Sequence, residues 1–214
     1  MTQPLLDELP PAQRLALAYA PRPARPATLA LLALDGRLGA VLRRRGDPVL
    51  AQIRFAWWRD VLGKPQAEWP RGDAVLGALG EWRDPVVLAS LVDGWEGLLA
   101  ETLDAETIDA FAAGRGRAFA QLAVELGVSA DSAGVCAVRW ALADLAANVA
   151  DSRERATVIE RARALPPRGR LPRALRPLAV LAALGQRSLD SDGTALLDGP
   201  GAALLAVRVG MIGR

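Results

Sequence analysis

The chain has 214 residues, of which 51% are hydrophobic and 23% charged, and its formal net charge is +2. This length and hydrophobic fraction suffice for a packed core without disulfides, and they exclude an intrinsically disordered chain. The sequence contains no histidine, which excludes Ser-His-Asp and Cys-His catalysis and the usual zinc sites. The single cysteine, Cys136, lies in an apolar stretch, so we expect a buried thiol in a reducing compartment.

Alanine and leucine dominate the sequence, whereas β-branched and aromatic residues are sparse, and this balance favours helices. Prolines and glycines separate a series of segments with helical periodicity. We see no alternating strand pattern, internal repeat or long linker. The sequence therefore predicts a single all-α domain over residues 1–214, with roughly eight to ten helices and an irregular N-terminal segment over residues 1–11.

Local signals set several of the helix boundaries. Thr28, Asp104 and Asp151 are suited to cap the N-termini of helices, and Gly127 is suited to stop the helix before it. Glu154 follows Asp151 by three residues, which is the pattern of a capping box. The predicted helices, in chain order, cover residues 12–20, 28–45, 48–62, 85–99, 104–125, 131–149, 151–165, 172–187 and 200–211.

A tryptophan pair marks the segment 48–62, which reads QIRFAWWRD at residues 52–60. Val49, Ile53, Trp57 and Val61 recur every four residues, so we expect this apolar stripe to face the core. We also expect at least one ring of Trp57 and Trp58 to be mostly buried. The flanking arginines are expected to snorkel or to pair with carboxylates.

The same string resembles the IRL-x-WWR-D-A-L stretch of the squalene/phytoene synthase family, particularly its bacterial branch. Four further segments resemble motifs of that family and occur in the same order. ALLAL at residues 30–34 resembles its ALYAF helix, and LVDGWE at residues 91–96 resembles its LIDG-x-E motif. WAL at residues 140–142 resembles its WALT motif, and RGRLP at residues 168–172 resembles its RGR-x-YLP motif. The similarity extends from about residue 12 to the C-terminus. It implies an isoprenoid-synthase-like helical bundle with a central cavity. Active members join two prenyl diphosphates head to head, with Mg²⁺ held by two aspartate-rich motifs.

The first of these aspartate-rich motifs is absent. The matching positions are Gly39, Ala40 and Arg43, which carry no carboxylate, and Asp35 lies one turn earlier. Mg²⁺ requires several hard oxygen ligands to neutralise the departing diphosphate. We therefore expect no resident cofactor, and Mg²⁺ only if the protein is an active enzyme.

The second motif falls on Asp144 and Asn148, which are spaced by four residues, with Asp151 one further turn along. If the protein is active, these three residues are the catalytic candidates, and Asp144 and Asn148 are weak candidates for metal ligands. The alternative roles are a salt bridge to a nearby arginine for Asp144 and a helix cap for Asp151. A carboxylate that faces a cavity needs a partner, and we expect Arg43 to pair with Asp144 and to close the diphosphate site.

Basic residues are unevenly placed, because residues 161–187 contain seven arginines and no acid. We expect this block to contact an anionic surface, most simply membrane phosphate. Nucleic acid is not an expected partner, because no aromatic residue follows Trp140. The residues expected to bind substrate phosphates are Arg43, Arg44, Arg168 and Arg170.

Three functions remain open. The loss of metal ligands resembles a non-catalytic branch of the family, which includes mitochondrial factors implicated in assembly of respiratory complex I. We favour a catalytically silent protein that binds a prenyl-type lipid or acts as an assembly or scaffold factor with an unidentified protein partner. The alternatives are an active prenyl diphosphate transferase with an altered metal site, and an unrelated helical adaptor. The sequence shows neither a signal-like N-terminus nor a spanning segment, so we expect a cytoplasmic protein that can sit peripherally on the inner membrane.

Overall fold

The computed structural model describes residues 3–43 and 47–213, which form eleven α-helices, three short 3-10 helices and no strand. The predicted all-α class is therefore confirmed. The helices are α1 (Gln3–Glu8), α2 (Pro11–Leu17), α3 (Arg25–Arg43), α4 (Pro48–Leu62), η1 (Gln66–Glu68), α5 (Ala74–Leu79), η2 (Pro85–Leu88), α6 (Ala89–Gly97), α7 (Ala105–Glu125), α8 (Ala133–Asn148), α9 (Ser152–Arg163), η3 (Arg173–Leu175), α10 (Arg176–Asp190) and α11 (Gly199–Ile212).

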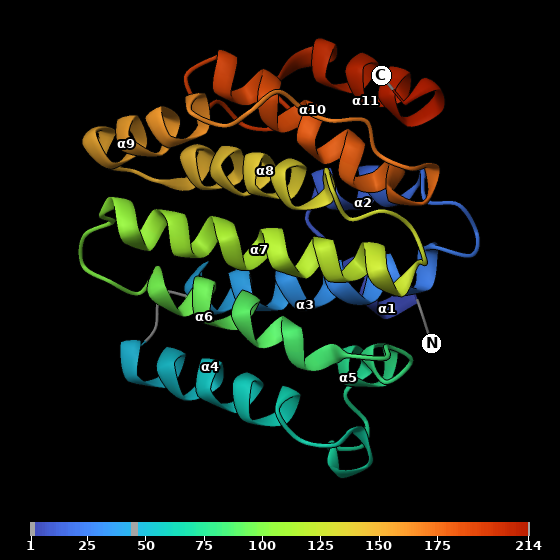
Figure 1. Cartoon of the computed structure of the whole chain (residues 1–214). Helices are drawn as coiled ribbons and strands as arrows, with labels where there is room; N and C mark the ends of the chain where they lie inside the picture. Colours follow the sequence, from blue (N-terminus) through green and yellow to red (C-terminus); the bar gives the residue numbers. More distant parts are fainter. Residues whose placement is uncertain (1–2, 44–46, 214) are drawn as a thin grey trace.

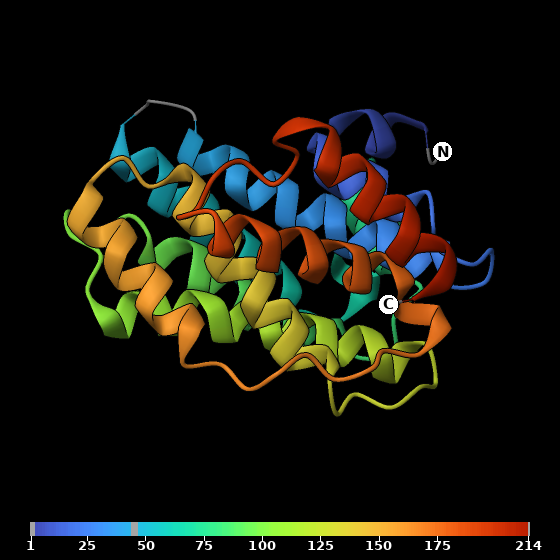
Figure 2. The same ribbon diagram turned by 90° about the horizontal axis from the view of Figure 1, so that it is seen from above.

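The helices form a stack in which α11, α10, α8, α7, α6 and α4 follow one another, each in contact with the next (Figure 1). Helix α3 lies beside α6 and α7 and also contacts α1, α2, α4 and α5, so it is central to the molecule. Seen from above, α10 lies on the near side over α8, and α11 lies on the near side over the N-terminal helices (Figure 2). One connected hydrophobic core extends from Leu5 to Val209.

The N-terminal segment is not irregular, so the prediction for residues 1–11 is wrong over its described part. Helix α1 packs on α3, and Leu5 and Leu9 are buried in the core. An isolated helix of this length is unstable in water, because the cost of nucleation exceeds the few hydrogen bonds gained. Packing against α3 therefore supplies the stability, which no local sequence signal could reveal.

The predicted N-caps at Asp104 and Asp151 are confirmed. Asp104 accepts a hydrogen bond from the backbone N–H of Thr107 (2.8 Å), and Asp151 accepts one from that of Glu154 (3.0 Å). These backbone hydrogen bonds favour the ionised form and lower the pKa of both carboxyl groups. The carboxylate of Glu154 accepts instead from the backbone N–H of Leu103 (2.8 Å), so it links α9 to the start of α7.

Two other boundary signals had different outcomes. Gly127 follows the end of α7 with φ of 66°, a left-handed conformation that suits glycine, so the predicted stop is confirmed. Thr28 does not cap a helix, because α3 begins three residues earlier. Its hydroxyl donates to the carbonyl of Ala24 (2.8 Å) inside the first turns of α3.

Helix α4 carries the tryptophan pair as predicted, with Trp58 buried and Trp57 40% exposed. The prediction that the stripe beginning at Val49 faces the core is wrong, because Val49, Ile53 and Trp57 all face outward. Residues spaced by four rotate by about 40° per step around a helix, so a long series of them leaves any one face. The core face instead includes Phe55 and Trp58.

Two further predictions concern the apolar segments of the chain. Within residues 3–43 and 47–213, no helix combines the length and the apolar character needed to cross a bilayer. Cys136 is a free, buried thiol, as predicted. Burial raises its pKa, so the reactive thiolate is disfavoured.

Candidate functional site

Helix α3 carries an aspartate into the centre of the molecule. Asp35 follows a run of buried leucines and alanines and is itself only 1% exposed. Its neighbours along the helix are apolar, so the sequence brings a charge to a position that water cannot reach. A buried carboxylate is costly unless it is paired and hydrogen-bonded. The site is therefore organised around the partners of this side chain.

The main partner is Arg115 of α7, whose side chain is completely buried. Its Nε lies 3.1 Å from Asp35 Oδ1 and its Nη2 lies 3.1 Å from Asp35 Oδ2, which is a two-pronged ion pair. Its remaining nitrogen, Nη1, lies 3.1 Å from Asp144 Oδ2 on α8. One guanidinium thus joins carboxylates from α3 and α8, which are the helices that face each other across α7.

Two neutral donors complete the environment of Asp35. Trp95 of α6 donates from Nε1 to Oδ1 (2.9 Å), and Gln13 of α2 donates from Nε2 to Oδ2 (3.0 Å). Burial raises the pKa of the Asp35 carboxyl, while the charge of Arg115 and the Trp95 hydrogen bond oppose that rise. The guanidinium also lies over the ring of Trp140, 4.1 Å from its centroid, so aromatic faces enclose the charges.

This ion-paired group forms one side of a cavity of about 730 Å³ bounded by α2, α3, α6, α7, α8 and the segment before α11. The other walls are largely apolar. Arg43 and Asn148 line the cavity at exposed positions. The apolar residues of the lining are Leu9, Leu42, Trp95, Leu98, Leu103, Phe111, Trp140, Leu145, Val149 and Leu196.

The three catalytic candidates do not form a common oxygen cluster. Asp144 is engaged by Arg115, and the amide of Asn148 donates to the backbone carbonyl of Asp144 (2.7 Å) in its own helix. Asp151 caps α9 and does not line the cavity. The alternative role of a helix cap is therefore the observed one for Asp151.

The expected ion pair between Arg43 and Asp144 is wrong. An arginine does pair with Asp144, but it is Arg115, because α7 lies between α3 and α8 and reaches both. Arg43 lines the same cavity and donates only a long hydrogen bond to the carbonyl of Gly36 (3.4 Å). Arg44, the other arginine assigned to this region, lies outside the described residues.

The arginines after α9 do not reach the cavity either. Arg168 and Arg170 are exposed in the segment between α9 and η3 and are absent from the cavity lining. Within the same block, Arg161 pairs with Asp109 and Arg163 with Asp192. The seven arginines are therefore not one continuous cationic surface.

The residues beside the cavity do not fit a magnesium site. Arg115 occupies the position between Asp35 and Asp144 where a cation would have to bind, and it already uses both carboxylates. Over the two described ranges, no three His, Cys, Asp or Glu residues are grouped closely enough to hold a metal. The guanidinium of Arg115 thus supplies the positive charge that a bound metal ion would supply in a metal site.

Sequence reasoning missed Arg115, Trp95 and Gln13 as members of the site. A signal for Arg115 exists, because it lies at the core position of a stripe in which Phe111 and Phe119 are four residues before and after it. An arginine in such a position must find a buried anion. No local signal identifies Gln13, since its role depends on how α2 packs on α3.

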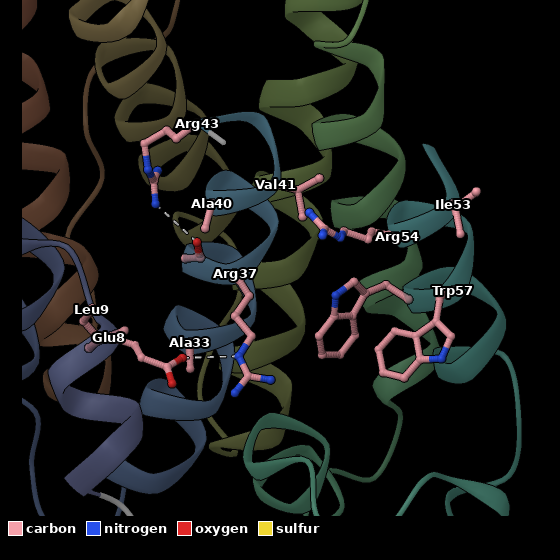
Figure 3. Close-up of a pocket in the computed structure, with 12 residues that line it drawn as sticks. Glu8, Leu9, Ala33, Arg37, Ala40, Val41, Arg43, Ile53, Arg54 and Trp57 are labelled. Atoms are coloured by element: carbon pink, nitrogen blue, oxygen red, sulfur yellow. Dashed lines mark hydrogen bonds and ion pairs between the residues drawn. The ribbon is translucent and has the colours of Figure 1, made fainter. Parts of the chain in front are cut away.

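A second hollow, of about 760 Å³, lies between α3 and α4 (Figure 3). Arg54 extends from α4 towards the side of α3 that carries Val41, while Arg37 reaches Glu8 of α1. Arg59 of the same helix does not line this hollow and pairs instead with Asp93 (2.7 Å) and Glu96 of α6. These ion pairs raise the pKa of Arg59 and tie α4 to α6.

Comparison of the chain with models of protein families, with curated proteins and with solved structures finds no match.

Proposed function

We propose that this protein is a catalytically silent relative of the squalene/phytoene synthases that binds a prenyl-type lipid in the cavity beside Arg115. The observation that carries the proposal is the pairing of Arg115 with both Asp35 and Asp144. Diphosphate ionisation requires cations held by free carboxylates. Here the guanidinium of Arg115 engages both Asp35 and Asp144, so neither carboxylate is free to hold such a cation.

The walls and size of the cavity support a lipid ligand. Its volume of about 730 Å³ falls within the range of ordinary small-molecule sites, and apolar atoms make up a little more than half of its exposed lining. An isoprenoid chain would bury its methyl and methylene groups there, at a gain of about 0.8 kcal/mol for each CH₂. The cavity therefore favours a long apolar chain over a compact polar substrate.

The charges beside the cavity also restrict the head group. Three of the five N–H donors of Arg115 already meet carboxylates, and its positive charge is shared between Asp35 and Asp144, so it attracts a phosphate only weakly. Exposed Arg43 is the remaining cation of the lining, and Glu8 is also present there. This balance favours an uncharged head, such as the alcohol of a prenol or the ring of a prenylated quinone, over a diphosphate.

Native mass spectrometry of the full chain tests this binding. The protein, stripped of lipid, is mixed with geranylgeraniol or a prenylated quinone, and we expect retention of one ligand. Leu98→Trp, which fills the cavity, should abolish retention, whereas Val124→Trp at an exposed position of α7 should not. Absence of any retained ligand, or equal retention by both variants, would contradict the proposal.

Turnover separates this proposal from an active transferase. With farnesyl or geranylgeranyl diphosphate and Mg²⁺, we expect a rate below about 0.1 per second, since ordinary enzymes exceed that value. Faster, magnesium-dependent condensation would show that Asp144 and Asn148 serve catalysis despite the ion pair. In that case the silent-site proposal would be wrong even if lipid binding were observed.

A further inference from the structure

Helix α11 has an unusual distribution of side chains. Its inward residues are small and include Ala202, Ala206 and Gly210, whereas its outward residues are large and apolar. Leu204 is 72% exposed and Met211 is 73% exposed. The outward stripe consists of Leu204, Val207, Met211 and Ile212, which we call the α11 stripe.

This distribution is the reverse of that expected for a surface helix, whose large apolar side chains normally face the core. A helix that is apolar on all sides is normally buried on all sides. Helix α11 has a single charged residue, Arg208, and its main packing partners are α10 and α2. Its inward side is closely packed, because a Cβ at Gly210 would lie 2.3 Å from the Tyr19 ring. The α11 stripe therefore has the composition of a covered surface.

A basic hollow adjoins the C-terminal end of the stripe. It has a volume of about 630 Å³ and its lining includes Tyr19, Arg22, Arg173, Arg176 and Met211, with no acidic residue. None of its three arginines has an ion pair or a side-chain hydrogen bond with another described residue. Guanidinium groups bind phosphate oxygens through paired N–H donors. An unpaired cluster of them is suited to phosphate groups.

We propose that the α11 stripe and the basic hollow together bind the surface of an anionic phospholipid bilayer. The stripe would enter the boundary between head groups and acyl chains, and the three arginines would meet lipid phosphates. Helix α11 lies at the edge of the stack, where a flat surface can approach it without meeting another helix (Figure 1). Apolar burial and charge attraction are the two signals that lasting attachment to a membrane surface requires.

A second copy of the chain fits this surface less well. A symmetric dimer through α11 would bring the same patch of each copy together. That patch carries Arg208 and the three arginines of the basic hollow, whose lining has no carboxylate, so both copies would bring positive charge to the contact. A surface of anionic lipid removes that conflict, because it supplies the opposite charge.

Vesicle sedimentation with the full chain tests the proposal. The vesicles contain phosphatidylcholine alone or phosphatidylcholine with phosphatidylserine, and no isoprenoid, so the outcome is independent of the cavity. We expect binding to the anionic vesicles at low salt, and a decline as salt is added. No binding to either composition, or equal binding to both, would overturn the proposal.

Matched variants locate the surface. The pair Leu204→Glu and Met211→Glu should weaken binding at least about tenfold, because both burial and charge become unfavourable. Val49→Glu, at another exposed apolar position on α4, is the control and should leave binding unchanged. Equal losses of vesicle binding in the α11 variant and in Val49→Glu would contradict the placement of the membrane-binding surface on α11.

The contribution of the three arginines is tested with a control variant that changes the net charge by the same amount. Combined replacement of Arg22, Arg173 and Arg176 by Gln should cost about fivefold in affinity for each residue. The same change at three unpaired arginines elsewhere, Arg54, Arg71 and Arg117, should cost much less. If the two triple variants lose affinity equally, net charge alone explains the binding. A dimer in sedimentation velocity that Leu204→Glu dissociates would instead assign α11 to self-association.

Discussion

At the scale of single residues, Arg115 has the largest effect on the site. Its guanidinium joins Asp35 and Asp144 and lies among aromatic rings, with almost no access to water. Isolated charges in such a place are very costly, so each of the charged groups depends on the others. The arrangement explains how an apolar helix such as α3 can retain an aspartate at its centre.

A double-mutant cycle tests this dependence. Arg115→Met should destabilise the protein by about 3–5 kcal/mol, because Asp35 would remain buried without its counter-ion. Adding Asp35→Asn should recover part of the loss, since the amide needs no counter-ion and keeps hydrogen bonds with its neighbours. The free energy of unfolding in urea measures both changes. Additive losses in the double variant would show that the two side chains do not depend on each other.

At the scale of helices, the crossing of α6 and α7 places the aromatic side of the cavity. Two glycines let the helices approach closely. A Cβ at Gly94 would lie 3.0 Å from Cα of Phe111, and one at Gly114 would lie 2.3 Å from the carbonyl oxygen of Ser90. This contact holds Trp95 and Phe111 edge to face, with ring centroids 4.9 Å apart.

Alanine at Gly114 should therefore destabilise the fold. Backbone atoms of α6 cannot move aside as a flexible side chain could, so we expect a loss of about 1–3 kcal/mol. Gly77→Ala in α5 is the matched control, because no atom lies within 4 Å of its added Cβ. That change should be neutral or stabilise by up to about 1 kcal/mol through helix propensity. Urea unfolding that shows equal effects at the two positions would refute the packing argument.

At the scale of the whole molecule, the core is continuous from α1 to α11. The helices at the two ends of the stack, α4 and α11, are linked through α6, α7, α8 and α10 in succession. Buried side chains shared between neighbouring helices make their unfolding interdependent. The single domain predicted from the sequence should therefore unfold as one unit.

Coincident unfolding curves would support that prediction. Tryptophans occur near one end of the stack (Trp58, Trp69 and Trp82) and in its interior (Trp95 and Trp140), so fluorescence follows tertiary packing in both regions. Far-ultraviolet circular dichroism follows the helices themselves. We expect the same midpoint from both signals in urea. Loss of fluorescence ahead of helicity would show that the protein does not unfold as one unit.

The sequence by itself determined the features that depend on local chemistry. Helical periodicity and composition predict the all-α class, and short-range hydrogen bonding explains why Asp104 and Asp151 could be identified as caps. Gly127 could be identified as a stop because its left-handed conformation suits few other residues. The buried Cys136 and the tryptophan pair on α4 follow from the same local patterns.

Only the tertiary structure decided which side chains meet. Asp35 and Arg115 are 80 residues apart, and nothing in the sequence specifies that α7 rather than α3 supplies the partner of Asp144. Packing also decided which face of α4 is buried and that α1 is a helix. These outcomes depend on the neighbours that each helix acquires on folding, because burial and ion pairing are properties of the assembled core and not of any segment alone.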